Sequence, residues 1–321
     1  MSRSPTKAGG TVRRKFADMT LIRGREFLMG SEDHYAEEAP VRRASVGDFW
    51  IDQHPVTNRE FAAFVADTGY ITFAEIPPDP RDYPGLAPEM ATAGSAVFMP
   101  TEGPVSLDDP GLWWRFVAGA DWRHPLGAES SIDGLMDHPV VQIAWVDAAA
   151  YARWAGKALP SEAEWEFAAR GGLEGAPFAW GQTLRPGGQA MANYWEGEFP
   201  WSHPEGRGVR RTSPVGAYPA NGYGLSDMIG NVWEWTGDWY TEATAEPAKG
   251  CCGPPRARTG ERAESVDPCT PDLLIPRKVA KGGSHLCAVN YCRRYRPGAR
   301  IGQAVDSPTS HIGFRCVVRR D

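Results

Sequence analysis

Two cysteines five positions apart are the side chains of this sequence that could do unusual chemistry. Cys287 and Cys292 follow the turn-forming segment Gly282-Gly283-Ser284. Two thiolates form a soft donor set, which among biological metals favours Cu(I). Residues five apart do not share a face of a regular helix or strand, so both sulfurs reach one point only where the backbone turns between them. From the spacing alone, two ordinary buried cysteines are an equally good interpretation.

The other four cysteines do not form a comparable pair. Cys316 lies in an apolar strand-like segment and is expected to be an inert buried thiol. Cys251, Cys252 and Cys269 belong to a Pro- and Gly-rich stretch. Adjacent cysteines cannot both serve one small site without strain, so this stretch is interpreted as an insertion of unknown role, in which a reactive or transient disulfide could form.

Composition and charge exclude several classes of protein. The chain has 321 residues and a net charge of -6, which argues against a nucleic-acid partner because such proteins normally carry a basic face. Arginines do collect at 293–300, but only locally. The sequence has no apolar run of membrane-spanning length, and residues 1–15 lack the apolar region of a signal peptide. We therefore expect no membrane partner and a cytoplasmic location.

The elements that must position the two cysteines are expected to be short. With 36 Gly, 28 Pro and 13 Trp, the sequence predicts many turns, little regular secondary structure and aromatic pegs in place of long helices. Capping boxes at 57–60 and 161–164 predict helices that end at Gly69 and at Gly171-Gly172, and Asp147 is expected to cap a third helix running to Trp154. The fold class predicted is α+β.

Strands are predicted at 21–30, 48–51, 140–145, 278–284 and 313–318. The stretch 76–110 contains many prolines and is expected to be loop. Residues 1–18 are expected to be a disordered basic leader. Because no linker or repeat divides the rest, 19–321 is expected to be a single domain.

Several segments in order resemble the formylglycine-generating enzymes, also called sulfatase-modifying factors. Six of them mark the wider superfamily: Phe27–Ser31, Val56–Asn58, Leu159–Gly172, Asn221–Leu225, Gly230–Trp235 and Gly313–Cys316. Others are similar to the formylglycine-generating branch itself: Trp113–Trp114, Gly119–Pro125, Asn193–Pro200, Gly282–Cys287 and Tyr291–Arg296. The resemblance runs from about residue 20 to 318 and implies an irregular C-type-lectin-like fold of the sulfatase-modifying-factor type.

This resemblance implies a copper-dependent oxidase. Cys287 and Cys292 match two thiolates that hold Cu(I), and the substrate is a cysteine in a Cys-x-Pro-x-Arg segment of an unfolded sulfatase. With O2 and a thiol reductant, that cysteine becomes Cα-formylglycine. Ser284 matches a serine beside the reacting oxygen, although it could also be a turn hydroxyl that bonds its own backbone.

Substrate contacts are also implied by the resemblance. They are Trp113, Trp114, Trp233, Tyr291, Arg296 and His311. For each Trp taken singly, packing in the core is the better interpretation, and the expectation is that at least one lines a cleft. The family often has Asn at His311 and His at Ala288, and both departures suggest a shifted substrate preference, because both thiols remain.

Two structural calcium sites are implied as well. The first matches Asp227, Gly230, Val232 and Glu234, which would supply two carboxylates and two main-chain carbonyls. The second would use Asn193 and the carbonyl of Tyr194. Its usual Asp is Arg207 here, and a guanidinium cannot ligate calcium. Either Glu205 substitutes for that Asp, or Arg207 replaces the cation.

Two other functions remain open from the sequence. One is an iron-dependent sulfoxide synthase of the same superfamily, against which the seven His argue because no two have helical ligand spacing. The other is a non-catalytic lectin-like binding module. Such a module has no reason to keep Cys287, Cys292 and Ser284 together, and it should not bind Cu(I) tightly through those thiols.

Overall fold

The computed structural model describes residues 16, 18–203, 211–242, 260–268 and 273–320. The expected leader at 1–18 lies almost wholly outside these residues, as do Glu205 and Arg207. Cys251, Cys252 and Cys269 also lie outside them. Within the described ranges, none of the helices has the length and apolar character needed to cross a membrane.

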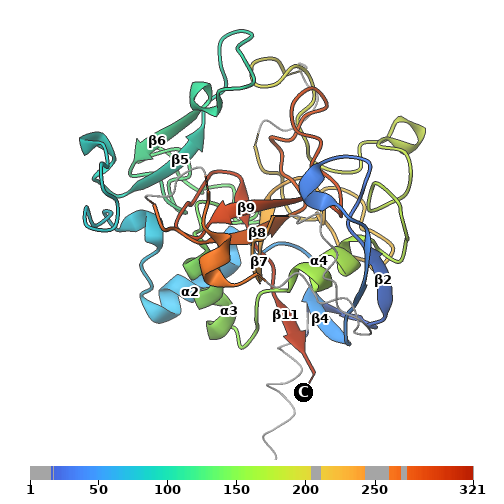
Figure 1. The fold of residues 1–321 in the computed structure, drawn as a ribbon. Coiled ribbons are helices and arrows are strands. Elements are labelled where there is room, and N and C mark those ends of the chain that lie inside the picture. Colours follow the sequence, from blue (N-terminus) through green and yellow to red (C-terminus); the bar gives the residue numbers. More distant parts are fainter. Residues whose placement is uncertain (1–15, 17, 204–210, 243–259, 269–272, 321) are drawn as a thin grey trace, which may run out of the picture.

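The fold has short elements and several small sheets (Figure 1). Its strands are β1 Met19–Ile22, β2 Glu26–Met29, β3 Arg42–Ser45, β4 Phe49–Asp52, β5 Gly94–Phe98, β6 Trp114–Ala118, β7 Trp233–Trp239, β8 Arg277–Lys281, β9 Arg300–Ala304, β10 Ile312–Gly313 and β11 Val317–Arg319. Its α-helices are α2 Asn58–Thr68, α3 Trp145–Trp154 and α4 Glu162–Ala169. Short 3-10 helices occupy 36–38, 73–75, 88–90, 110–112, 186–188 and 262–265. The prediction of an irregular α+β fold is confirmed.

The central sheet has the order β10-β7-β8-β9 and holds the segment that carries the two cysteines. β8 and β9 are antiparallel, and Lys281 is opposite Arg300 in their register. The loop 282–299 therefore follows β8 directly and leads into the neighbouring strand β9, so its two ends lie side by side. Three more strands, in the order β1-β4-β11, form a second sheet, and β2-β3 and β5-β6 form pairs. Figure 1 shows β5 and β6 to one side of the central strands.

Buried charges fix both ends of this loop against α4. Lys281 Nζ lies 2.9 Å from Glu166 Oε2, and Arg300 Nε lies 2.7 Å from Glu162 Oε1. All four side chains are buried. Breaking a buried ion pair leaves an uncompensated charge, so these pairs hold the stems of the loop in one arrangement.

The helix signals in the sequence are largely confirmed. Thr57 and Ser161 close capping boxes with Glu60 and Glu164, and α2 ends at Gly69 in a left-handed conformation. The prediction for Asp147 is corrected, because it is not the N-cap residue. It lies in the first turn of α3, and its Oδ2 accepts a bond of 2.9 Å from the N–H of the N-cap residue, Ala144.

Several strand predictions are wrong. Residues 140–145 form no strand, and the apolar run is explained by burial under the core before α3 begins. The segment 21–30 holds two strands of different sheets, and the expected loop 76–110 contains β5, which pairs with β6. β7 and β9 were not predicted at all, because β7 is buried at its start and β9 is partly buried, without the alternation that marks a one-sided strand.

Aromatic side chains are among the largest fully buried groups of the interior. The main core contains Phe61, Tyr151, Trp165, Trp235 and Phe314. A second cluster lies above the cysteine loop and contains Phe98, Trp113, Trp195, Phe199, Leu286 and Ala288. This second cluster joins β5 to the loop 282–299, and it forms one wall of the site described next.

Candidate functional site

Two glycines turn the chain sharply where it leaves β8. Gly282 has φ +92° and Gly283 has φ +73°, which L side chains rarely adopt. A Cβ at Gly282 would lie 2.8 Å from both the Met228 carbonyl oxygen and the Trp165 ring. A Cβ at Gly283 would lie 2.6 Å from the Arg294 carbonyl oxygen. The turn therefore packs the two arms of the loop against each other, and no larger residue would fit.

The backbone then turns again and brings the two thiols together. The Cys287 N–H donates to the Ser284 carbonyl at 3.0 Å, and the Cys292 N–H donates to the Ala288 carbonyl at 3.0 Å. The two Sγ atoms lie 3.2 Å apart, and neither forms a disulfide. Cys287 is buried and Cys292 is partly exposed. The expectation that the chain turns between the cysteines is confirmed, and the outer sulfur is the one that solvent reaches.

The surroundings shift the pKa values of the two thiols in opposite directions. A hydrogen bond from the Cys287 thiol and the nearby Arg294 guanidinium lower the pKa of Cys292, while burial opposes them. Burial raises the pKa of Cys287 well above its usual value. In the metal-free pair, Cys292 is therefore the thiol that loses its proton more readily.

Arg294 is a functional side chain that the sequence reasoning missed. Its Nη1 lies 3.8 Å from Cys292 Sγ, and its other nitrogens bond Glu37 Oε1 at 2.6 and 3.2 Å. Its guanidinium also lies over the Tyr35 ring at 3.8 Å. Glu37 and Tyr35 come from a segment some 250 positions away, so only the collection of arginines at 293–300 could have suggested such a role.

Ser284 is fully buried directly beside the pair. Its N–H points at Cys287 Sγ (3.4 Å), and its Oγ accepts from the Leu286 N–H at 3.2 Å. The same oxygen lies 3.4 Å from His311 Nδ1. Burial lowers the pKa of His311 well below its ordinary value, so the imidazole is neutral. Ser284 thus has both the local turn bond and a position between the thiol pair and His311.

The expected substrate contacts divide into exposed and buried groups. Trp113 is only 1% exposed and Trp233 is also buried, so both pack in the interior as the plainer interpretation held. Trp114 is partly exposed, and its ring contacts the His311 ring edge-on at 4.8 Å. Tyr291 is 36% exposed and stacks on Phe199 at 4.6 Å. Trp114 and Tyr291 are therefore the two aromatic side chains of the set that reach the surface.

Arg296 is placed differently from the expectation. It is buried, and its Nη1 bonds Glu38 Oε2 at 2.7 Å while its Nε bonds the Arg293 carbonyl at 2.7 Å. Its guanidinium therefore makes structural contacts within the protein. The expected contact with substrate is not supported by this geometry, because the charge is already paired.

The acidic turn expected to bind calcium keeps one of its two carboxylates. Both Glu234 oxygens accept from Arg315 at 2.8 Å, and Oε2 also accepts from Trp165 Nε1 at 2.8 Å. Asp227 differs, because it is buried and bonded to the Gly216 N–H at 2.7 Å, and it forms no ion pair with the residues that the structure describes. Of the two carboxylates expected to bind calcium, only Glu234 is thus paired with an arginine in the described part of the chain.

Asn193 has a side-chain oxygen without a hydrogen-bond partner among the described residues. It is buried, and its Nδ2 donates to the Arg211 carbonyl at 2.8 Å, while its Oδ1 has no hydrogen-bond partner. An orphaned buried acceptor is costly. A cation is one partner that would satisfy it, as the calcium expectation at Asn193 and Tyr194 requires.

Across the described part of the chain, no three His, Cys, Asp or Glu side chains converge on a point that could hold a metal ion. The thiol pair is thus a site of two protein sulfurs.

Comparison with known proteins agrees with this site. A family model described as the sulfatase-modifying factor enzyme 1-like domain matches residues 5–320. The chain belongs to this family. A Mycobacterium tuberculosis protein named formylglycine-generating enzyme is 52% identical over 302 residues, which cover 94% of this chain and 97% of that one. A Bos taurus protein named inactive C-alpha-formylglycine-generating enzyme 2 is 36% identical and covers 93% and 87%.

The fold also resembles a solved structure. That structure is PvdO from Pseudomonas aeruginosa, with a TM-score of 0.59, 22% identity and 93% coverage of each chain. At this identity the likeness shows the fold alone. It agrees with the irregular α+β fold predicted from the sequence.

Proposed function

We propose that this chain converts a cysteine of a sulfatase polypeptide into Cα-formylglycine. The observation that carries the proposal is the pair of unbridged thiols, with sulfurs 3.2 Å apart beside the partly exposed Tyr291. The name of the Mycobacterium tuberculosis relative supports the same reaction. The Bos taurus relative named inactive belongs to the same set, so family membership by itself does not assign the activity. The assignment depends on the side chains.

The thiol pair fits Cu(I) as far as the protein ligands are concerned. Two sulfurs face each other, one is already a thiolate, and soft donors of this kind select Cu(I). Bound there, copper would supply the redox chemistry with O2 that no side chain has. Cys287 and Cys292 would hold it, and the partly exposed side of Cys292 leaves room for the sulfur of a substrate.

The other side chains have separate tasks. Arg294 keeps Cys292 in the thiolate form, and Glu37 and Tyr35 hold Arg294 in place. Ser284 accepts from the Leu286 N–H, so its own proton is available to donate to a reduced oxygen species or to His311. Trp114 and Tyr291 offer flat apolar surface on which an extended peptide can lie.

The proposed reaction balances with O2 and a thiol reductant. The substrate side chain loses two hydrogens and becomes a thioaldehyde, and water then replaces sulfur to give the aldehyde and hydrogen sulfide. Reduction of O2 to two waters takes four electrons. The cysteine supplies two of them, and two thiols supply the other two as they form a disulfide.

Calcium fits this chain only in part. Asp227 is a buried carboxylate without an ion pair, and Asn193 Oδ1 is an orphaned acceptor, so each could ligate a hard cation. Glu234 does not fit, because Arg315 already neutralises it. We therefore assign any calcium a structural role at Asp227 or Asn193 and none in the reaction.

The test is conversion of a synthetic peptide containing Cys-x-Pro-x-Arg. The peptide is incubated with Cu(I)-loaded protein, a thiol reductant and air, and is read by mass spectrometry beside Cys287→Ala. We expect an aldehyde product with the wild type and none with the variant. Copper binding without conversion would point to another client sequence, with Ala288 and His311 as the first positions to examine. Neither binding nor conversion would favour a lectin-like binding module.

A further inference from the structure

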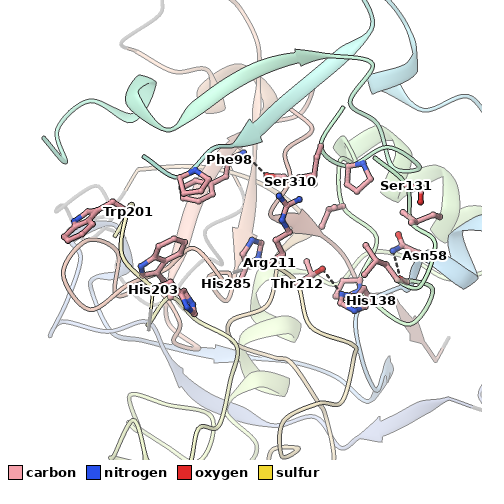
Figure 2. A pocket seen from close by; sticks show the side chains of 18 residues that line it. Asn58, Phe98, Ser131, His138, Trp201, His203, Arg211, Thr212, His285 and Ser310 are labelled. Atoms are coloured by element: carbon pink, nitrogen blue, oxygen red, sulfur yellow. Dashed lines mark hydrogen bonds between the residues drawn. The ribbon is translucent and has the colours of Figure 1, made fainter. Parts of the chain in front are cut away.

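A cavity of about 240 Å³ lies beside the thiol site and is not used by the proposed chemistry (Figure 2). Its walls are mostly apolar. They include Phe98, Ile132, Leu135, Val141, Trp195 and Trp201. A space of this size and lining accommodates a large aliphatic or aromatic side chain, and sites of this kind use a few polar groups to fix orientation.

Three segments contribute to the cavity and to the thiol site at once. The Trp195 ring lines the cavity, while the Trp195 N–H donates to the Cys287 carbonyl at 2.9 Å. His285 lines the cavity two residues before Cys287. Ser310 lines it beside His311, which contacts Ser284. The walls of the cavity and of the thiol site are therefore built from neighbouring residues.

The cavity holds two polar acceptors that lack a donor. Asn58 is only 4% exposed, and its Nδ2 donates to the Leu135 carbonyl at 2.8 Å while its Oδ1 has no partner. His285 Nδ1 lies 2.8 Å from the Asn231 carbonyl and must therefore carry the proton. The other ring nitrogen, Nε2, is then the acceptor of this tautomer and has no hydrogen-bond partner among the residues that the structure describes. Buried acceptors of this kind suit the N–H groups of a bound peptide.

One cation faces this cavity without a counter-ion. Arg211 lines it, and Figure 2 shows its side chain among the lining residues. Its guanidinium forms no ion pair with the residues that the structure describes. Burial, with no carboxylate to offset it, lowers the pKa of Arg211. Arg211 is exposed, and a guanidinium without a counter-ion among the described residues favours a carboxylate, which it can bind through two parallel hydrogen bonds.

We propose that this cavity binds an apolar side chain, together with a neighbouring carboxylate, of the polypeptide that presents its cysteine to the thiol pair. The proposal rests on the proposed function, since it names a second recognition element of the same substrate. It commits to a polypeptide because the residues that line the cavity adjoin those of the thiol site along the chain and through the Trp195 hydrogen bond. The charge on Arg211 then specifies an acidic residue beside the apolar one.

The test compares three peptides that share the Cys-x-Pro-x-Arg core. One is the core alone, and the other two extend it by Leu-Leu-Glu on the amino or the carboxyl side. Affinity is measured by calorimetry with full-length protein and with Ser in place of the substrate Cys, so that binding is read without conversion. We expect one extension to tighten binding about tenfold or more, as burial of one leucine side chain would give.

Two variants and one control locate that gain. Ser131→Trp places a ring at the cavity from an exposed position and should abolish the gain while leaving the core peptide unchanged. Arg211→Gln should weaken the Glu-containing extension about tenfold and leave a matched Gln-containing extension unchanged. Arg153→Gln, an exposed arginine on α3, should change nothing.

Three results would overturn the proposal. The first is an equal affinity for all three peptides. The second is a gain in affinity that survives Ser131→Trp. The third is an equal loss of affinity for the Glu-containing and the Gln-containing extension with Arg211→Gln. Failure of the proposed function is read separately. It would be failure of the wild type to convert the core peptide with its Cys intact, whereas the cavity is tested by binding alone.

Discussion

The thiol pair and the acidic turn at 227–234 were both expected to bind metal, and the structure treats them differently. At the thiol pair the two sulfurs face each other at 3.2 Å, and the nearest charged group is Arg294 at 3.8 Å. At the acidic turn Glu234 is held by Arg315 through two bonds of 2.8 Å and by the Trp165 indole. The two sulfurs are close enough for both to bind one metal ion. Of the two carboxylates at the acidic turn, Glu234 is already paired with an arginine.

The difference shows that matching ligand residues is not the same as having ligands available. Both sets have the residue types that their metals prefer. Availability depends on side chains that come from far along the chain, because Arg315 reaches Glu234 from 81 positions away. Arg315 bonds both oxygens of the Glu234 carboxylate, whereas Arg294 donates a single long hydrogen bond of 3.8 Å to Cys292 Sγ and lowers the pKa of that thiol.

The largest expected effect is the loss of Cu(I) affinity when one of the two sulfurs is removed. With Cys287→Ser, we expect Cu(I) affinity to fall by about a thousandfold or more, because a hydroxyl is a poor ligand for a soft ion. Competition with a chromophoric Cu(I) chelator measures the affinity. Cys316→Ser is the matched control, a buried free thiol outside the site, and should keep wild-type affinity. Equal losses in both variants would contradict the assignment.

The second prediction concerns the partner of Glu234. Replacing Arg315 with Met leaves a buried carboxylate without its cation, and we expect the free energy of unfolding to fall by about 3–5 kcal/mol. Chemical denaturation measures it. Arg319→Met removes a pair with Glu164 in which the arginine is nearly half exposed, and should cost about 1 kcal/mol or less. A loss in the Arg315 variant that added calcium fully reverses would show that Glu234 is a calcium ligand.

The third prediction tests the carboxylate that stays available. Adding calcium at tenfold its Kd to chelator-treated protein should raise the free energy of unfolding by about 1.4 kcal/mol. Asp227→Asn should reduce this response, and Asp137→Asn, at an exposed carboxylate, should not. An unchanged response in the Asp227 variant would remove this residue from the calcium sites and leave Asn193 as the candidate.

The smallest expected effect is at Arg294. In metal-free protein at neutral pH, Arg294→Met should slow alkylation of Cys292 by a few-fold, up to about tenfold, because it raises the pKa of that thiol. Labelling with iodoacetamide followed by peptide mapping gives the rate. Arg293→Met is the control, since Arg293 is exposed and its Nε bonds the Val289 carbonyl. A rate that is the same in both variants would mean that the Cys287 thiol alone sets the pKa of Cys292.

Local signals in the sequence predicted local structure well. The capping boxes at Thr57 and Ser161 and the Gly69 terminus are each decided within one turn of chain, so the residue types alone suffice. The spacing of the two cysteines required a turn between them only if both sulfurs reach one point, and the structure has that turn. Cys316 is buried as its apolar surroundings indicated.

Interactions between distant segments could not be predicted. The pairings of Arg296 with Glu38 and of Arg315 with Glu234 join residues far apart, and each withdrew a residue from its expected role. The cavity beside His285 and Arg211 draws on loops near residues 58, 98, 132, 195 and 310, and no local pattern marks it. The fold class and the two thiols could therefore be predicted from the sequence. The ion pairs of the expected site residues and the cavity could not.

The central claim is that the thiol pair holds the metal that carries the oxidation. The most direct test is to load the protein with Cu(I) in steps from zero to two equivalents and to measure, at each step, the rate of aldehyde formation in a Cys-x-Pro-x-Arg peptide. We predict a rate that rises linearly, levels at one copper per chain and stays at background throughout in Cys292→Ser. Conversion at zero copper, or equal conversion by Cys292→Ser, would contradict the account.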